Sequence, residues 1–344
     1  MNKKRTIFNI IFLVICFAVT MYYVFRGEDL EAVHRNMQYA NSLYWIVGVG
    51  FVIIFIVCEA WILDYLLKIF GQKIKFTHCC MYSFVGFFVS CITPSASGGQ
   101  PAQMVFMKKD NIPLHESTIV LMMVTITYKA VLVLYGLLLV IIRPTSIMNF
   151  LGDAVFWVYL GIFLNVVVVG AMILLTVKPM IMRHIVVFIF SALHKITNSD
   201  RLEKLKFRVE RAMEAYVEKA EFMITHKLTM LKIFVITFVQ RTILFAITFL
   251  VFLSFGIKGA GLVDVTALQG LISVAVDMLP LPGGMGISEH LFLIIFEPMV
   301  GSDMTIPIMI VSRGISYYTQ LVMSALVSAI AYINFFGRRR NRAL

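Results

Sequence analysis

Two interrupted apolar regions decide the fold: region 76–109 contains Thr93-Pro94-Ser95-Ala96-Ser97-Gly98-Gly99-Gln100-Pro101, and region 262–299 contains Pro280-Leu281-Pro282-Gly283-Gly284-Met285-Gly286. Proline and glycine end helices, so each region is predicted to form two short helices. After Pro101, only a few residues precede Lys108-Lys109, and seven helical residues cover about 10 Å. The first region therefore predicts a hairpin that enters and leaves on one side. The second region leaves a crossing open, because residues 286–299 would cover about 21 Å.

The composition places these interruptions in a membrane protein. Of 344 residues, 60% are hydrophobic and 14% are charged, and the mean hydropathy is +0.89. Soluble chains are typically about 45–50% apolar and about 25% charged. These values exclude a soluble enzyme, a disordered protein and a secreted disulfide scaffold. The five cysteines lie in apolar runs without a CxxC motif, which supports neither a disulfide framework nor a zinc site.

The remaining apolar stretches are long enough to cross a bilayer, which takes about 20 helical residues. They are 6–25, 44–67, 117–142, 154–177, 229–256 and 304–334. The sequence thus predicts an all-α integral membrane protein with about six full transmembrane helices plus two re-entrant hairpins. Broken backbone is tolerated at membrane depth only inside protein or against a wet cavity. We therefore expect both interruptions to line a central cavity, with the turn 95–100 inside the protein.

The distribution of basic residues orients the chain. The formal net charge is +11, from 30 Lys and Arg against 19 Asp and Glu. Placing both termini in the cytoplasm puts most of the basic residues on that side, as the positive-inside rule requires. We expect a multi-pass protein of a bacterial-type cytoplasmic membrane, and no nucleic-acid partner. Residues 179–227 form a predicted cytoplasmic amphipathic connector with nearly balanced charge.

The predicted spans and hairpins form two units of opposite topology. The first half, 44–142, contains a hairpin that opens inward, and the second half, 229–334, contains one that opens outward. Inverted repeats with interrupted helices near the membrane midplane are a recurrent transporter design. We treat 1–344 as a single membrane domain built on this repeat.

The two interruptions supply one set of candidate binding residues. A helix that restarts within the protein points free N–H groups and partial positive charge at its N-terminus, where phosphate or carboxylate groups bind. The alternative is that Gly and Pro only permit tight packing. The candidates for a substrate site are Ser95, Ser97, Gly98, Gly99, Gln100, Gly283, Gly284, Gly286, Ser288 and Glu289.

Cations within spans supply the second set. Lys129 and Arg241 lie close to the centres of their spans, where an isolated cation costs at least about 2.5–3.5 kcal/mol. We expect them either to bind an anionic substrate or to form structural ion pairs. The candidate acids for such pairs are Glu59, Asp64, Asp277 and Glu289. Arg313 is a weaker cationic candidate, and Asp277 and Glu289 are candidates for proton coupling or ion pairing.

Enzymatic motifs are not found. The chain has no Gly-x-Ser-x-Gly, no GxxxxGK[ST] and no HExxH, and its seven histidines are scattered. We expect no enzyme activity, no cofactor and no metal.

The segments Thr93–Gln103 and Leu279–Glu289 resemble the lysylphosphatidylglycerol synthase transmembrane family, which includes the flippase domain of the bacterial multiple peptide resistance factor. The similarity covers about 5–335, with both motifs in the expected order. The resemblance implies a membrane fold that moves lipids between leaflets, in characterised relatives aminoacylated phosphatidylglycerol. Relatives that synthesise this lipid carry a soluble aminoacyltransferase domain after the membrane part. Since this chain ends at Leu344, we expect no transferase activity.

These observations predict a flippase that moves an anionic, phosphate-bearing lipid by alternating access. Two rivals remain: a secondary transporter for a small anionic solute, and a membrane-embedded lipid-phosphate transferase. The expected partner is a membrane phospholipid or polyprenyl-linked lipid. A second copy of the chain and a separate lipid-modifying enzyme are further candidates.

Overall fold

The structure is a computed structural model that describes residues 30–38, 40–142, 154–178, 180 and 226–336. The predicted span 6–25 and nearly all of the predicted connector 179–227 lie outside the described residues. Within the described ranges every regular element is a helix, as predicted. In chain order the elements are α2 (Leu30–Gln38), α3 (Ser42–Ile69), α4 (Phe76–Cys91), η1 (Pro94–Ala96), α5 (Gly99–Lys109), α6 (Leu114–Ile142), α8 (Val155–Val177), α11 (Lys227–Ser254), α12 (Leu262–Val276), η3 (Pro282–Gly284), α13 (Ile287–Val300), α14 (Ser302–Arg313), η4 (Gly314–Thr319) and α15 (Gln320–Phe336).

Five helical stretches are long and apolar enough to cross a membrane. They are α3, α6, α8, α11 and the continuous segment Ser302–Ile333 formed by α14, η4 and α15. These coincide with five of the predicted spans to within a few residues. Large apolar side chains such as Ile46, Phe163 and Leu326 are exposed on their outer faces, as in helices that face lipid. The chain is a multi-pass membrane protein.

The first interrupted region forms the predicted hairpin. Helices α4 and α5 contact each other along their length, and the turn between them contains the 3₁₀ turn η1. Helix α5 starts at Gly99. A side chain at this position would clash with α4, because a Cβ would lie 2.1 Å from Ser90 Oγ and 2.9 Å from the Gly86 carbonyl oxygen. Glycine at position 99 thus allows the two helices to approach closely.

The second interrupted region is also a hairpin, which settles the crossing left open by the sequence. Helix α13 has 14 residues, so it covers about 21 Å, less than the hydrocarbon thickness of about 30 Å. The chain turns at Gly301, with φ 82°, directly into α14. Helices α12 and α13 therefore begin and end at the same side of the molecule.

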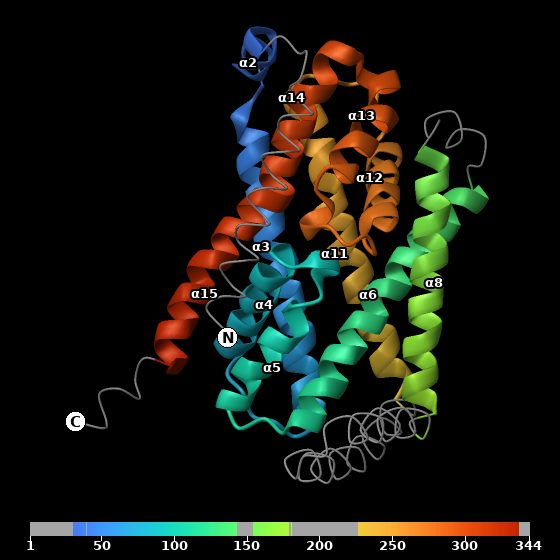
Figure 1. The fold of residues 1–344 in the computed structure, drawn as a ribbon. Helices are drawn as coiled ribbons and strands as arrows, with labels where there is room; N and C mark the ends of the chain where they lie inside the picture. Colours follow the sequence, from blue (N-terminus) through green and yellow to red (C-terminus); the bar gives the residue numbers. More distant parts are fainter. Residues whose placement is uncertain (1–29, 39, 143–153, 179, 181–225, 337–344) are drawn as a thin grey trace, which may run out of the picture.

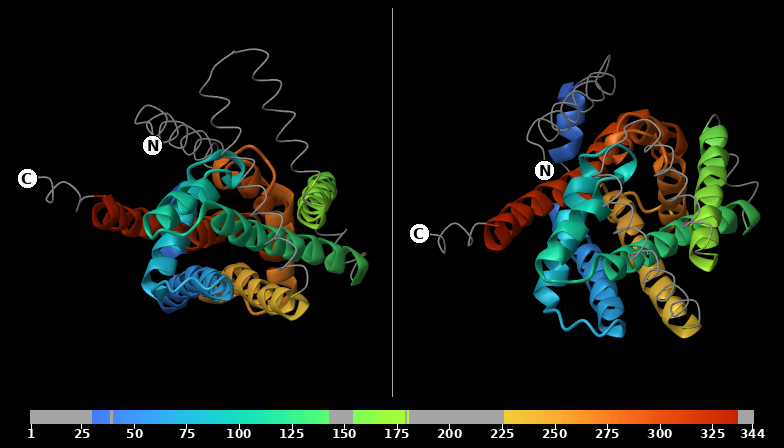
Figure 2. Two further views of the ribbon diagram at one scale, coloured as in Figure 1. Left: turned by 90° about the horizontal axis from the view of Figure 1, so that it is seen from below. Right: turned by 60° about the horizontal axis from the view of Figure 1, so that its bottom comes forward.

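The two hairpins enter from opposite ends and meet at their closed ends. Figure 1 shows α4 and α5 in the lower half and α12 and α13 in the upper half, and η1 contacts η3 where they meet. Helices α3 and α11 lie side by side, while α15 and α8 flank the molecule on opposite sides (Figure 2). The predicted inverted arrangement of two units is present in the structure.

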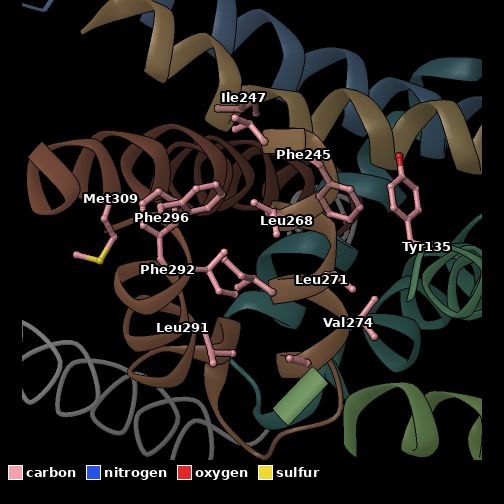
Figure 3. Packing of buried hydrophobic residues seen from close by; sticks show 14 of the residues in the cluster. Tyr135, Phe245, Ile247, Leu268, Leu271, Val274, Leu291, Phe292, Phe296 and Met309 are labelled. Carbon is pink, nitrogen blue, oxygen red and sulfur yellow. The ribbon is translucent and has the colours of Figure 1, made fainter. Parts of the chain in front are cut away.

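Two apolar clusters, one in each half of the molecule, combine residues of both units. Residues from α6, α11, α12, α13 and α14 pack in the upper half, among them Phe245, Leu271 and Phe292 (Figure 3). A second cluster in the lower half joins α3, α4, α5 and α6 around Leu63, Tyr82 and Met107. The polar interruptions lie between these two clusters, so the fold confines its polar groups to a central layer.

Candidate functional site

A cavity of about 270 Å³ lies between the two units. Both interruptions contribute to its wall, together with α3, α4, α6, α11 and η4. Ten predicted residues line it: Glu59, Ser95, Gly99, Gln100, Arg241, Asp277, Gly283, Gly284, Ser288 and Arg313. Ligand pockets for drug-sized molecules start at about 300 Å³, so this cavity is large enough for a small polar group and too small for acyl chains.

The two interruptions share one backbone conformation. Thr93 (φ −119°, ψ 144°) and Leu281 (φ −118°, ψ 136°) each precede a proline. The residues after these prolines, Ser95 and Gly283, are left-handed, with φ 50° and 58°. Glycine adopts this conformation freely, whereas a serine pays a steric cost. Ser95 is thus the strained member of the matched pair, and strained backbone is found preferentially at functional sites. The Ser95 hydroxyl also donates to the Leu279 carbonyl oxygen at 3.1 Å, which joins the units.

Lys129 is placed in an ion pair rather than on the cavity wall. Its ammonium group contacts one carboxylate oxygen of Asp277 on the other unit, and the Tyr128 hydroxyl donates to the second oxygen. The side chains of Lys129 and Asp277 are each 8% exposed. Each oxygen of the carboxylate thus has a donor, and the opposite charges of the pair lie in direct contact.

Arg313 and Glu289 form a second buried pair, from α14 to α13. Arg313 Nε donates to Glu289 Oε1 at 2.8 Å, and its terminal nitrogen donates to the Gly283 carbonyl oxygen at 3.0 Å. The other Glu289 oxygen accepts from the Gly286 N–H at 2.7 Å. The carboxylate of Glu289 therefore takes up one N–H group, that of Gly286, at the start of the second restarting helix.

Arg241 differs from the other two cations because it has no carboxylate partner. Its guanidinium lies over the Tyr128 ring, 3.8 Å from the centroid, and 4.9 Å from the centroid of Phe55. Its Nε is buried, and no described group accepts a hydrogen bond from it. Among the described residues, Arg241 is the cation of the cavity wall that lies against aromatic faces and forms no ion pair.

Several predicted site residues lie away from the cavity wall. Gly98 and Gly286 precede the restarting helices without lining the cavity. Asp64 pairs with Lys68 at 2.6 Å near the end of α3. The Ser97 side chain is exposed and donates to the Pro94 carbonyl oxygen. The expectation that the whole turn 95–100 lies inside the protein is thus wrong for Ser97 and right for Gly99, which is buried.

Three features of the site carried no signal in the sequence. Ser83 lines the cavity, is fully buried and has a hydroxyl without a described partner. Tyr128 contacts both Asp277 and the Arg241 guanidinium. A π-helical turn at Gly314–Thr319 places Tyr317 against the first interruption, where its hydroxyl donates to the Cys91 carbonyl oxygen at 2.9 Å. Such turns occur often at functional sites. No sequence pattern within this apolar stretch predicts the turn.

No group of three or more metal-ligating side chains is found among the described residues.

Comparison with known proteins identifies the family. The family model of the lysylphosphatidylglycerol synthase TM region matches residues 8–324. A search of curated proteins gave no match. With the match covering nearly the whole chain and the two interruptions facing one central cavity, the chain belongs to the lysylphosphatidylglycerol synthase transmembrane family.

Proposed function

We propose that this protein moves a lipid with an anionic, phosphate-bearing headgroup between the leaflets of a bacterial-type cytoplasmic membrane. The observation that carries the proposal is Arg241: a half-buried cation with a buried Nε and no carboxylate in ion-pair contact among the described residues, on the wall of a cavity that both inverted units build. A cation within a span is costly unless it has a function or a partner. A phosphate would supply the acceptors that the guanidinium lacks.

The shape of the cavity supports a lipid as the substrate. Its volume of about 270 Å³ accommodates a headgroup and leaves the acyl chains outside. Ala96, Ser97 and Pro280, at the meeting tips of the two hairpins, are exposed. Irregular backbone does not face hydrocarbon unprotected, so a polar route between the surface and the cavity fits this position. The headgroup would cross along this route while its chains stay in the bilayer.

The orientation follows from charge. Lys68, Lys73, Lys75, Lys108 and Lys109 gather at the end where α3 and α5 finish. The opposite end carries Glu31, Asp264, Glu297 and Asp303. The positive-inside rule assigns the lysine-rich end to the cytoplasm. The inverted repeat supports alternating access, in which one unit rocks against the other about the shared cavity. On this reading the protein is a transporter and no step of covalent chemistry is involved.

Native mass spectrometry of the purified protein tests the substrate class. We expect wild-type protein to retain one anionic phospholipid or polyprenyl phosphate per chain, and Arg241→Gln to lose it. Lys258→Gln is the control. It removes an exposed cation outside the cavity, at the end of the molecule away from the lysine-rich end, and should keep the lipid. Retention of zwitterionic and anionic lipids in the ratio of the membrane, unchanged by Arg241→Gln, would favour the rival transporter of a small anionic solute.

A further inference from the structure

The central layer contains two ion pairs, Lys129–Asp277 and Arg313–Glu289, and two charged residues that form no ion pair among the described residues. Both oxygens of Asp277 accept, from Tyr128 and Lys129. Both oxygens of Glu289 accept, from Arg313 and the Gly286 N–H. Each of these two carboxylates is therefore already held by a cation and by a second donor.

Glu59 and Arg241 are the two charged residues that form no such ion pair. Glu59 lies on α3 and lines the cavity, and the Gln240 amide donates from its Nε2 to one carboxylate oxygen of Glu59 at 3.3 Å. Its residue exposure is 9%. Arg241 is one residue further along α11, and no ion pair joins it to Glu59. The Arg241 guanidinium lies over the ring of Phe55, one helical turn before Glu59 on α3, and all three residues line the same cavity.

The surroundings of Glu59 hold few other charges. Helix α11 presents Arg241 and the neutral Gln240, and α6 presents the Tyr128 hydroxyl, which is held by Asp277. Cys58 is its titratable neighbour on α3. Helix α4 contributes Ser83 and Ser90 to the same cavity wall, and η4 contributes Tyr317. Asp277 and Arg313 line the same cavity and are each held in an ion pair, so Arg241 is the cation of the wall that is left to face Glu59.

We propose that Glu59 is a proton-binding site coupled to Arg241, so that one proton enters the cavity with each anionic headgroup. The empty site holds Arg241 as a cation and Glu59 as a carboxylate, which balance. A phosphodiester on Arg241 adds a negative charge beside Glu59 and cancels the field that favours the carboxylate. A proton from the aqueous phase then binds a carboxylate oxygen of Glu59 and makes it a neutral carboxylic acid.

This coupling keeps the central layer at constant charge. Lys129, Arg241 and Arg313 balance Asp277, Glu289 and Glu59 when the site is empty. With a monoanionic headgroup bound, they balance Asp277, Glu289 and the phosphate while Glu59 is protonated. A net charge in a layer of low dielectric constant is costly. The neutral loaded site can therefore be exposed to either side without moving uncompensated charge, and a proton gradient can drive the lipid.

The proposal rests on the proposed function, since it requires an anion on Arg241. Calorimetric titration of the full chain in detergent tests it, using dihexanoylphosphatidylglycerol as the probe in buffers of different ionisation enthalpy. We expect wild-type protein to take up about one proton per probe bound, so that the dissociation constant increases up to tenfold per pH unit. Glu59→Gln should bind the probe with no proton uptake and no pH dependence. Glu297→Gln, the same change at an exposed position outside the cavity, should behave as wild type.

The outcomes separate the two proposals. Binding to the wild type without proton uptake, or proton uptake retained by Glu59→Gln, overturns the coupling and leaves the lipid site intact. Absence of binding of both the probe and inorganic phosphate by the wild type refutes both proposals. Inorganic phosphate is titrated in parallel: proton-linked binding of phosphate without binding of the lipid would keep the coupled site and refute the lipid as its ligand. The wild-type stoichiometry alone is decisive if Glu59→Gln does not fold.

Discussion

Replacing Lys129 by methionine tests whether this residue holds the fold together or holds the substrate. The change keeps side-chain length and removes the charge that faces Asp277, a group 8% exposed. Breaking a buried ion pair by removing one partner costs about 3–5 kcal/mol, because the remaining charge has no counterion. The Tyr128 hydroxyl still donates to Asp277, so we expect a value near the lower end of that range. At roughly 2 °C per kcal/mol for a large domain, the melting temperature should fall by several degrees.

The double variant Lys129→Met/Asp277→Asn removes both charges and should recover most of the lost stability. The assay is thermal unfolding in detergent for the wild type, the two single variants and the double variant, with probe binding measured on each. Binding should persist in the double variant, since Arg241 and not Lys129 faces the cavity. An unchanged melting temperature in Lys129→Met together with lost binding would refute this reasoning and place Lys129 in the substrate site.

Three further predictions concern the interruptions and the orientation. Gly283→Ala should cost roughly 2–4 kcal/mol, since φ is +58° and the new Cβ would lie 2.1 Å from the Tyr317 ring; an unaltered melting curve would contradict the close contact. Ala96→Gly should stabilise by about 0.5–1 kcal/mol, because it relieves a left-handed alanine with φ 53°; a lower melting temperature would count against strain there. In a background without native cysteines, Lys258→Cys in intact cells should react with an impermeant maleimide and Lys73→Cys should not, and the reverse labelling would invert the assigned topology.

The spans and interruptions were predictable because they depend on local sequence. Twenty apolar residues in a row have few alternatives to a membrane helix. Pro94 and Pro282, each followed within a few residues by glycine, interrupt the apolar runs in which they stand. The hairpin at 262–299 needed the structure, since α13 is long enough to leave a crossing open and only the turn at Gly301 decides its direction.

The sequence predicted most of the charged residues of the site, but not which acid pairs with which cation. Lys129 and Asp277 are separated by 148 positions, so no periodicity connects them. Arg313 was the weaker candidate on position alone, yet its side chain lines the cavity and closes on Glu289. A burial cost explains why these charges need partners, but which acid meets which cation depends on tertiary packing. Ser83, one serine in an apolar helix, becomes notable only when its hydroxyl is found unpartnered at the cavity wall.

The transbilayer movement of lipid in reconstituted liposomes tests the central claim most directly. Fluorescent phosphatidylglycerol is followed by chemical quenching of the outer leaflet, with wild-type protein, Arg241→Gln and the surface control Lys258→Gln at equal reconstitution. Loss of one charge-assisted contact of about 1.5–3 kcal/mol should lower headgroup affinity roughly 10- to 150-fold. We predict movement by the wild type and the control, and at least a tenfold slower rate for Arg241→Gln at limiting lipid. Equal rates for Arg241→Gln and the wild type would contradict the assignment of the headgroup site to Arg241.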